Sequence, residues 1–227
     1  MRKKVKYRNS RFERIKGYGG IEDPQEYINS KYGSGWAELH TASIAEIKSF
    51  TQAELRNDAN NCALASITRI MKYYSDKGYN NIPSDINTIY ENVREIGVNH
   101  GYDPKKAGIM RDLFVYTPWG MGNMVKDTWK GFGYFKGGGR NIYFRRLDTI
   151  KRNIDNFNPL LLNIAFGYYR NHTVSVIGYK IFSKKGKRNK IFIQIYDGWS
   201  RTKRYIDWVR FRKTPASLTV CIMPVGE

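Results

Sequence analysis

Cysteine and histidine are scarce in this sequence of 227 residues, which has two cysteines and three histidines. Two cysteines, Cys62 and Cys221, are too few for a disulfide scaffold. No pair of cysteines or histidines has the spacing of a zinc motif such as CxxC or HExxH. We therefore expect no metal ion and no cofactor, and we expect Cys221, which lies in an alternating apolar segment, to be an inert buried thiol.

Long apolar segments are also missing. The chain has no run of about 18 apolar residues, the length that a membrane-spanning helix requires. The first residues, MRKKVK, are basic and lack the apolar core of a signal peptide. We expect no membrane span. A cytoplasmic location is the default expectation, and an extracellular or cell-wall location applies if a signal peptide has been removed.

Acidic residues are few relative to basic ones. The chain has 20 Asp and Glu against 39 Lys and Arg, which gives a formal net charge of +19. The positive charge concentrates at residues 2–16, 184–190 and 201–212. Residues 184–190 lie between two apolar segments and contain Gly186, so they are typical of a solvated hairpin tip. The charge predicts an anionic partner, such as an anionic polymer, a cell-wall surface or non-specifically bound nucleic acid.

Helical patterns dominate the first part of the chain. Residues 1–35 are basic and polar, and we interpret them as an arm or lead-in segment with one short helix at 23–31. A glycine-rich loop is expected at 131–139. Further helices are predicted at residues 60–78, 84–96 (begun by Ser84 and ended by Gly97), 105–116, 122–130 and 147–156.

Strand patterns dominate the remainder. Apolar or alternating segments predict strands at residues 160–166, 172–182, 190–196, 204–211 and 218–225. This order predicts an α+β fold. We expect one domain at residues 36–227, with a helical lobe over about 36–156 and an antiparallel sheet lobe over about 157–227.

Three residues occupy positions that suit nucleophilic catalysis. Cys62 lies near the start of the strongest predicted helix, His172 starts a predicted strand and Asp197 follows the next one. A helix N-terminus favours the thiolate form of a cysteine, and a carboxylate can fix the tautomer of a histidine. His40 and His100 lie in polar or turn-like segments and are poorer candidates for the base. The order therefore predicts a nucleophile, its base and the residue that orients the base.

Four segments together resemble the papain-like cysteine peptidases, most closely their bacterial C39-like branch. They are NNCALASITRIMKYY at residues 60–74, NFNP at 156–159, NHTVSVIG at 171–178 and IYDGW at 195–199. The resemblance implies a helical lobe that carries the nucleophile and a barrel-like sheet that carries the base. It also implies that Cys62 attacks a peptide carbonyl, that His172 acts as general base and later acid, and that Asp197 orients His172.

The sequence departs from that family around the oxyanion hole. Papain-like enzymes usually have a glutamine six residues before the nucleophile, where this chain has Arg56. Ala63 replaces the glycine that often follows the nucleophile. We expect the amide of Asn60, or that of Asn57, to supplement the Cys62 backbone N–H in the hole. Asn60 also fits the role of an N-terminal helix cap.

Three function classes are compatible with these residues. The first is a cysteine peptidase that forms a thioester with a peptide or protein substrate. The second is a transglutaminase-like or cell-wall amidase enzyme with the same Cys, His and Asp order. The third is a basic nucleic-acid-binding protein on a catalytically inactive papain-like scaffold.

Overall fold

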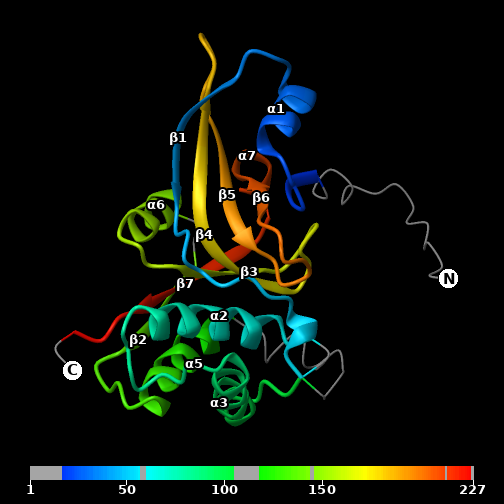
Figure 1. Cartoon of the computed structure of the whole chain (residues 1–227). Coiled ribbons are helices and arrows are strands. Elements are labelled where there is room, and N and C mark those ends of the chain that lie inside the picture. The colour runs from blue at the N-terminus through cyan, green and yellow to red at the C-terminus, as the bar shows by residue number, and fades with distance from the viewer. Residues whose placement is uncertain (1–16, 57–59, 105–117, 144–145, 213, 226–227) are drawn as a thin grey trace, which may run out of the picture.

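Figure 1 shows the computed structural model of the protein. The structure describes residues 17–56, 60–104, 118–143, 146–212 and 214–225. The basic segment at residues 2–16, the helix predicted at 105–116 and Asn57 lie outside the described residues.

The helices predicted at residues 23–31, 60–78, 84–96, 122–130 and 147–156 are present, with shifted ends. The helical elements are α1 (Pro24–Tyr32), the 3₁₀ helix η2 (Gln52–Glu54), α2 (Cys62–Asp76), α3 (Ile86–Asn99), α5 (Pro118–Gly131), α6 (Leu147–Asp155) and α7 (Trp208–Phe211). The strands are β1 (Ala37–Ser43), β2 (Gly138–Ile142), β3 (Leu160–Ile164), β4 (His172–Ser183), β5 (Lys190–Tyr196), β6 (Arg204–Asp207) and β7 (Ala216–Ile222). The predicted α+β class is confirmed.

The strands form one antiparallel sheet in the order β2-β7-β3-β4-β5-β6, and β1 also pairs with β4. Because β2 and β6 lie at opposite ends of this path, the sheet that the described residues form is not closed into a complete barrel. On one edge, β4 pairs first with β3 and then with β1. The change of partner occurs near Gly178, where an added Cβ would lie 2.6 Å from the backbone oxygen of Ala42. Only glycine allows so close an approach.

Helix α2 lies between the sheet and the helices α3 and α5 (Figure 1). Almost every one of its 15 residues is buried, because β4 covers one side and α3 another. Helix α3 passes through Gly97 and ends at Asn99, so the predicted stop at Gly97 was wrong. An added Cβ at Gly97 would lie 2.6 Å from Cδ2 of Leu64, so this glycine serves helix packing instead. The cap is Asp85, whose carboxylate accepts from the Thr88 N–H, and not Ser84.

The first part of the chain contributes more to the sheet than its pattern indicates. Within the expected arm, Tyr18 and Ile28 are fully buried, and Ile21 forms a β-bridge with Tyr205. Strands β1 and β2, both inside the expected helical lobe, pair with β4 and β7. The helical lobe and the sheet lobe are therefore interwoven along the sequence.

The strand predicted at residues 204–211 was half wrong, since β6 ends at Asp207 and α7 follows. The Asp207 carboxylate accepts from the backbone N–H groups of Val209 and Arg210 and caps the new helix.

Within the described ranges, none of the helices is long and apolar enough to cross a membrane.

We predict that Gly139→Ala destabilises the fold while Gly120→Ala does not. A Cβ at Gly139 would lie 2.3 Å from the backbone oxygen of Gly122, so β2 and α5 would have to separate, which costs about 1–3 kcal/mol. At Gly120 in α5, such a Cβ would meet no atom within 4 Å from other described parts of the chain, and alanine there gains up to about 0.5–1 kcal/mol. The urea concentration at the unfolding midpoint, compared at an unchanged m-value, measures both changes in the free energy of unfolding. Equal midpoints for the two variants would contradict the close contact.

Candidate active site

The structure brings the start of α2 and the start of β4 together. Cys62 is the first residue of α2 and His172 the first residue of β4, and their side chains are 7% and 6% exposed. An asparagine with left-handed backbone comes shortly before each element, Asn60 (φ 59°) before α2 and Asn171 (φ 51°) before β4. Asparagine tolerates this conformation better than most residues do. The backbone thus turns sharply before each element, and the side chains of Cys62 and His172 lie buried where α2 meets β4.

The register between α2 and β4 is fixed by polar contacts on one face of the helix. Ser66 donates from its hydroxyl to the backbone oxygen of Thr173 (3.1 Å), one turn beyond Cys62. Arg69, almost one turn further, donates from Nη1 to the Ser175 hydroxyl (3.1 Å). Because these residues follow Cys62 at helical spacing, the same contacts place Cys62 against the first residue of β4.

The imidazole of His172 has a defined tautomer. Its Nε2 lies 2.6 Å from the backbone oxygen of Asp197. A carbonyl oxygen only accepts, so Nε2 carries a proton and donates it to this oxygen. Nδ1 is then the ring nitrogen that is left for the side-chain hydrogen bond between His172 and Cys62.

Cys62 and His172 shift each other's titration. Burial by itself raises the pKa of the Cys62 thiol, but the charge and hydrogen bond of His172, with smaller contributions from Thr173 and Tyr102, lower it from 9.0 to about 7. Burial lowers the pKa of His172, but the charge and hydrogen bond of Cys62, followed by the Asp197 contacts, raise it overall. Each group therefore favours the charged form of the other, the thiolate of Cys62 and the imidazolium of His172.

Asp197 lies beside His172, but its carboxylate takes a different position from the expected one. Oδ1 accepts from the backbone N–H groups of Trp199 (2.9 Å) and Ser200 (3.1 Å), and Oδ2 accepts from the Tyr169 hydroxyl (3.3 Å). The contact with His172 is made by the Asp197 backbone oxygen instead. The carboxylate fixes the turn after β5, and that turn aims the carbonyl at the imidazole.

Aromatic rings that were not predicted as site residues surround the pair. Trp199 packs on His172 with ring centroids 4.4 Å apart, and Tyr169 is stacked on His172 at 5.8 Å. The Tyr102 hydroxyl lies 3.9 Å from the Cys62 sulfur, accepts from the Ala63 N–H and donates to the Asn60 oxygen. Only Trp199 had a signal in the sequence, because it follows Asp197 in the DGW motif.

The segment before Cys62 supplies several amides. The cap position of α2 is Asn61, which has no side-chain cap hydrogen bond, so the cap role expected of Asn60 was wrong. The buried Asn61 donates from Nδ2 to the backbone oxygens of Gln52 and Leu55. Asn60 itself is exposed. Its contribution to an oxyanion hole stays a prediction.

Gln52, ten residues before Cys62, lies next to the segment that precedes the nucleophile, because Asn61 donates to its backbone oxygen. Its backbone N–H donates to the oxygen of Gly198 (2.8 Å), and its Oε1 is buried without a hydrogen-bond partner in the described part of the chain. Arg56, at the position where the family usually has a glutamine, pairs with Glu91 on α3 (2.6 Å). A glutamine is thus present near the site, at a longer spacing from the nucleophile than the family usually has.

The remaining cysteine and histidines lie elsewhere. Cys221 is buried in β7, and burial raises its pKa to about 12. His40 contacts the hydroxyl of Tyr179, and His100 pairs with Asp127. Over the described ranges, no three His, Cys, Asp or Glu side chains are grouped so as to hold a metal ion.

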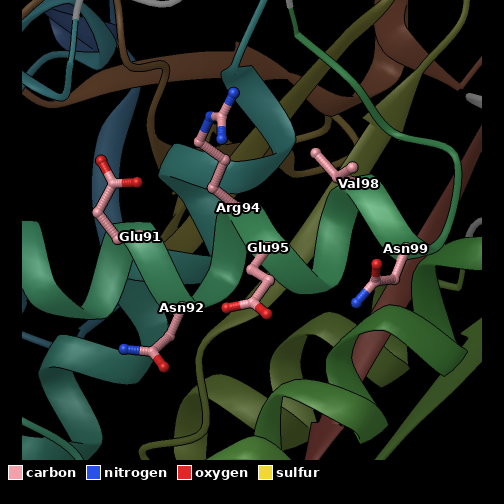
Figure 2. Close-up of a pocket in the computed structure, with 6 residues that line it drawn as sticks. All are labelled: Glu91, Asn92, Arg94, Glu95, Val98 and Asn99. Atoms are coloured by element: carbon pink, nitrogen blue, oxygen red, sulfur yellow. The ribbon is translucent and has the colours of Figure 1, made fainter.

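A surface hollow of about 410 Å³ lies along α3 (Figure 2). All the residues assigned to its lining come from this one helix: Glu91, Asn92, Arg94, Glu95, Val98 and Asn99. A catalytic site needs groups that converge from different elements, as they do at Cys62 and His172. The interface between α2 and β4, and not this hollow, is therefore the candidate active site.

The comparison with protein families agrees with this geometry. A family model described as the Peptidase_C39 like family matches residues 44–216, well over half of the chain. The chain belongs to the Peptidase_C39 like family. Membership of this family indicates a cysteine peptidase, and the matched segment contains Cys62, His172 and Asp197. A search among curated proteins found no match.

We predict that iodoacetamide alkylates Cys62 with a rate that rises to a plateau around a midpoint near pH 7, because only the thiolate reacts. Cys221 stays unlabelled under the same conditions. His172→Ala removes the cation, so burial becomes the main influence on the pKa of the Cys62 thiol. The pH midpoint of Cys62 alkylation therefore moves upward, above the ordinary thiol value of 9.0. Peptide mapping after short labelling measures both cysteines. A wild-type midpoint near 9, or preferential labelling of Cys221, would refute the assignment.

Proposed function

We propose that the protein hydrolyses peptide bonds with Cys62 as nucleophile and His172 as general base and acid. The observation that carries this proposal is the buried pair itself, in which the pKa of the thiol is lowered to about 7 while that of the imidazole is raised. Membership of the Peptidase_C39 like family supports the same reaction class. Perturbed titration of two adjacent groups in this arrangement is typical of an activated nucleophile.

The reaction proceeds in two halves. The Cys62 thiolate attacks the substrate carbonyl carbon, and the carbonyl electron pair moves onto oxygen. The proton on Nδ1 of His172 passes to the leaving amine as the C–N bond breaks, which leaves a thioester. A water molecule then attacks the thioester carbon and gives a proton to His172, and collapse of this second intermediate releases the acid and the thiolate.

The oxyanion is stabilised by groups at the N-terminal end of α2. The Cys62 backbone N–H belongs to the first turn of the helix, where N–H groups have no intrahelical acceptor. We propose Asn60 and Gln52 as alternative sources of a second donor. Gln52 has the stronger support, because its backbone is bonded to Gly198 and its side chain is partly buried, whereas Asn60 is exposed.

We predict that Asp197→Asn keeps appreciable activity, whereas Asp197→Ala lowers kcat/KM by at least about tenfold. Asparagine retains an oxygen for the N–H groups of Trp199 and Ser200, so the Asp197 carbonyl stays in contact with His172. Alanine removes this acceptor and releases the turn. Cleavage of a peptide library, followed by mass spectrometry and kinetics on the best substrate, measures the difference.

Two controls accompany this experiment. Cys62→Ser and His172→Ala should both abolish turnover, and thermal unfolding should show that every variant is folded. If Asp197→Asn is as inactive as Cys62→Ser, the carboxylate takes part in the chemistry directly and the turn-fixing role is wrong. Added primary amine reports on the transglutaminase-like alternative, because amine incorporation in place of hydrolysis would assign the protein to that class.

The positive charge favours an anionic polymer as a binding partner. Among the cations of the β4–β5 hairpin, Lys184 donates to the Ser34 oxygen and Lys190 lies over the Tyr32 ring. Lys185, Lys187 and Arg188 are exposed at the tip. We therefore assign the contact with an anionic surface to these three side chains.

We predict that this contact is separate from catalysis. Binding to a short DNA duplex should fall steeply with salt, and replacing Lys185, Lys187 and Arg188 by glutamine should lower the slope of log K against log salt by about 0.9 per lost phosphate contact. Cleavage of a short neutral peptide should not respond to salt, because the buried ion pair is poorly screened. Binding isotherms and kcat/KM from low to physiological salt give both quantities.

A matched control replaces three exposed cations elsewhere, Lys31, Lys126 and Arg152, and so makes the same change in net charge. An equal loss of binding in both triple variants would show that only net charge matters. Sequence-selective binding that persists at physiological salt, without detectable hydrolysis, would instead assign the protein to the nucleic-acid-binding class.

A further inference from the structure

A short segment outside the family match lies directly behind the candidate active site. Residues 17–21, which we call the N-terminal strap, precede the matched residues 44–216. The Tyr18 hydroxyl donates to the backbone oxygen of Phe166 (2.8 Å) and accepts from the Tyr169 N–H (3.3 Å). The strap therefore binds the loop that leads into His172.

Tyr169 connects the strap to Asp197 and to His172. The Gly20 N–H donates to the Tyr169 hydroxyl (3.1 Å), so the hydroxyl proton is directed to Oδ2 of Asp197 (3.3 Å). The Tyr169 ring is fully buried and is stacked on His172 with an interplanar angle of 15°. Burial, followed by the charge of Asp197, raises the pKa of Tyr169, so its hydroxyl stays a neutral donor.

Glycines allow the strap to approach this closely. An added Cβ at Gly19 would lie 2.6 Å from the Tyr169 ring, and one at Gly20 would lie 2.2 Å from the Tyr168 hydroxyl. Gly20 also has a φ of 68°, which disfavours other residues. Beyond the glycines, Ile21 is bonded to the edge strand β6 through both backbone bonds with Tyr205. The strap is thus anchored to the sheet at one end and fitted against two tyrosines at the other.

We propose that the N-terminal strap completes the catalytic apparatus by holding Tyr169 as a positioning residue for Asp197 and His172. Tyr169 touches neither substrate nor thiol in this scheme. Its ring packs against the His172 imidazole. Its hydroxyl donates to the Asp197 carboxylate, which fixes the turn after β5. The inference rests on the proposed peptidase function, and it adds to that function a segment that the family model does not include.

The test uses the full chain with three single substitutions. Tyr169→Phe removes the hydroxyl that bridges Gly20 and Asp197, and Gly20→Ala displaces the strap without altering Tyr169. Tyr73→Phe is the control, because this buried tyrosine also donates one hydrogen bond from its hydroxyl, here to the backbone oxygen of Phe157 (2.9 Å), away from Asp197 and His172. Each protein is assayed for kcat and KM and for the pH dependence of Cys62 alkylation.

A positioning role predicts that Tyr169→Phe and Gly20→Ala lower kcat about three- to tenfold with little change in KM. It also predicts that both move the Cys62 alkylation midpoint upward, because a less restrained imidazolium stabilises the thiolate less. Tyr73→Phe should change neither quantity, although it should lower thermal stability comparably. Changes in stability alone for all three variants, with unchanged alkylation profiles, would overturn the proposal.

The alkylation profile separates this proposal from the peptidase assignment. A wild-type midpoint near 7 without cleavage of any peptide would refute the peptidase function, and the strap would still be judged by the shifts in its two variants. A wild-type midpoint near 9 would refute both, because there would be no ion pair to position.

Discussion

The interaction between the buried side chains of Cys62 and His172, at the contact of α2 and β4, places the strictest demand on this structure. A thiolate and an imidazolium lose hydration when buried, and they recover that free energy only at short range and with good geometry. Cys62 and His172 are 110 positions apart in the sequence, so the geometry depends on how two elements dock. The contacts of Ser66 and Arg69 with β4 set this docking, and the rest of the helical lobe supports it from behind.

Arg69 shows how the protein accommodates a second buried charge near the pair. It is fully buried, and burial lowers its pKa to about 10, while the charges of Tyr196, Asp197 and Glu54 oppose that shift. The guanidinium donates to the Phe50 backbone oxygen (2.7 Å) and lies over the Phe50 ring. A lysine would lack the planar face and the divergent donors that these contacts need. The residue couples the loop before η2 to the helix that bears the nucleophile.

The sequence predicted those parts of the protein that follow a strong local pattern. Helices α2 and α6 and strands β4 and β5 have clear apolar periodicity, and they lie where that periodicity places them. Strand β1 was missed because its first residues are exposed on the sheet edge, and β2 was missed because it begins with two glycines. Neither segment has the alternating apolar residues from which a strand is predicted.

At the site, the sequence could indicate residue types but not the atoms in contact. The DGW motif marked Asp197, yet whether its carboxylate or its carbonyl faces His172 depends on the turn that follows. Tyr102 and Tyr169 lie in segments without periodicity, and their contacts depend on chain crossings that no local pattern encodes. Gln52 was overlooked because it lies further before Cys62 than the usual spacing of the family glutamine.

The pairing of Ile21 with Tyr205 also joins a part of the chain that is synthesised early to one that is synthesised late. The strap leaves the ribosome early, but its partner strand β6 is made only after most of the chain, so this contact closes a very long loop. Contacts of such high sequence separation form late in folding. The same order applies to Cys62, which is synthesised 110 residues before His172, so the contact that lowers the pKa of its thiol forms only after β4 has been added.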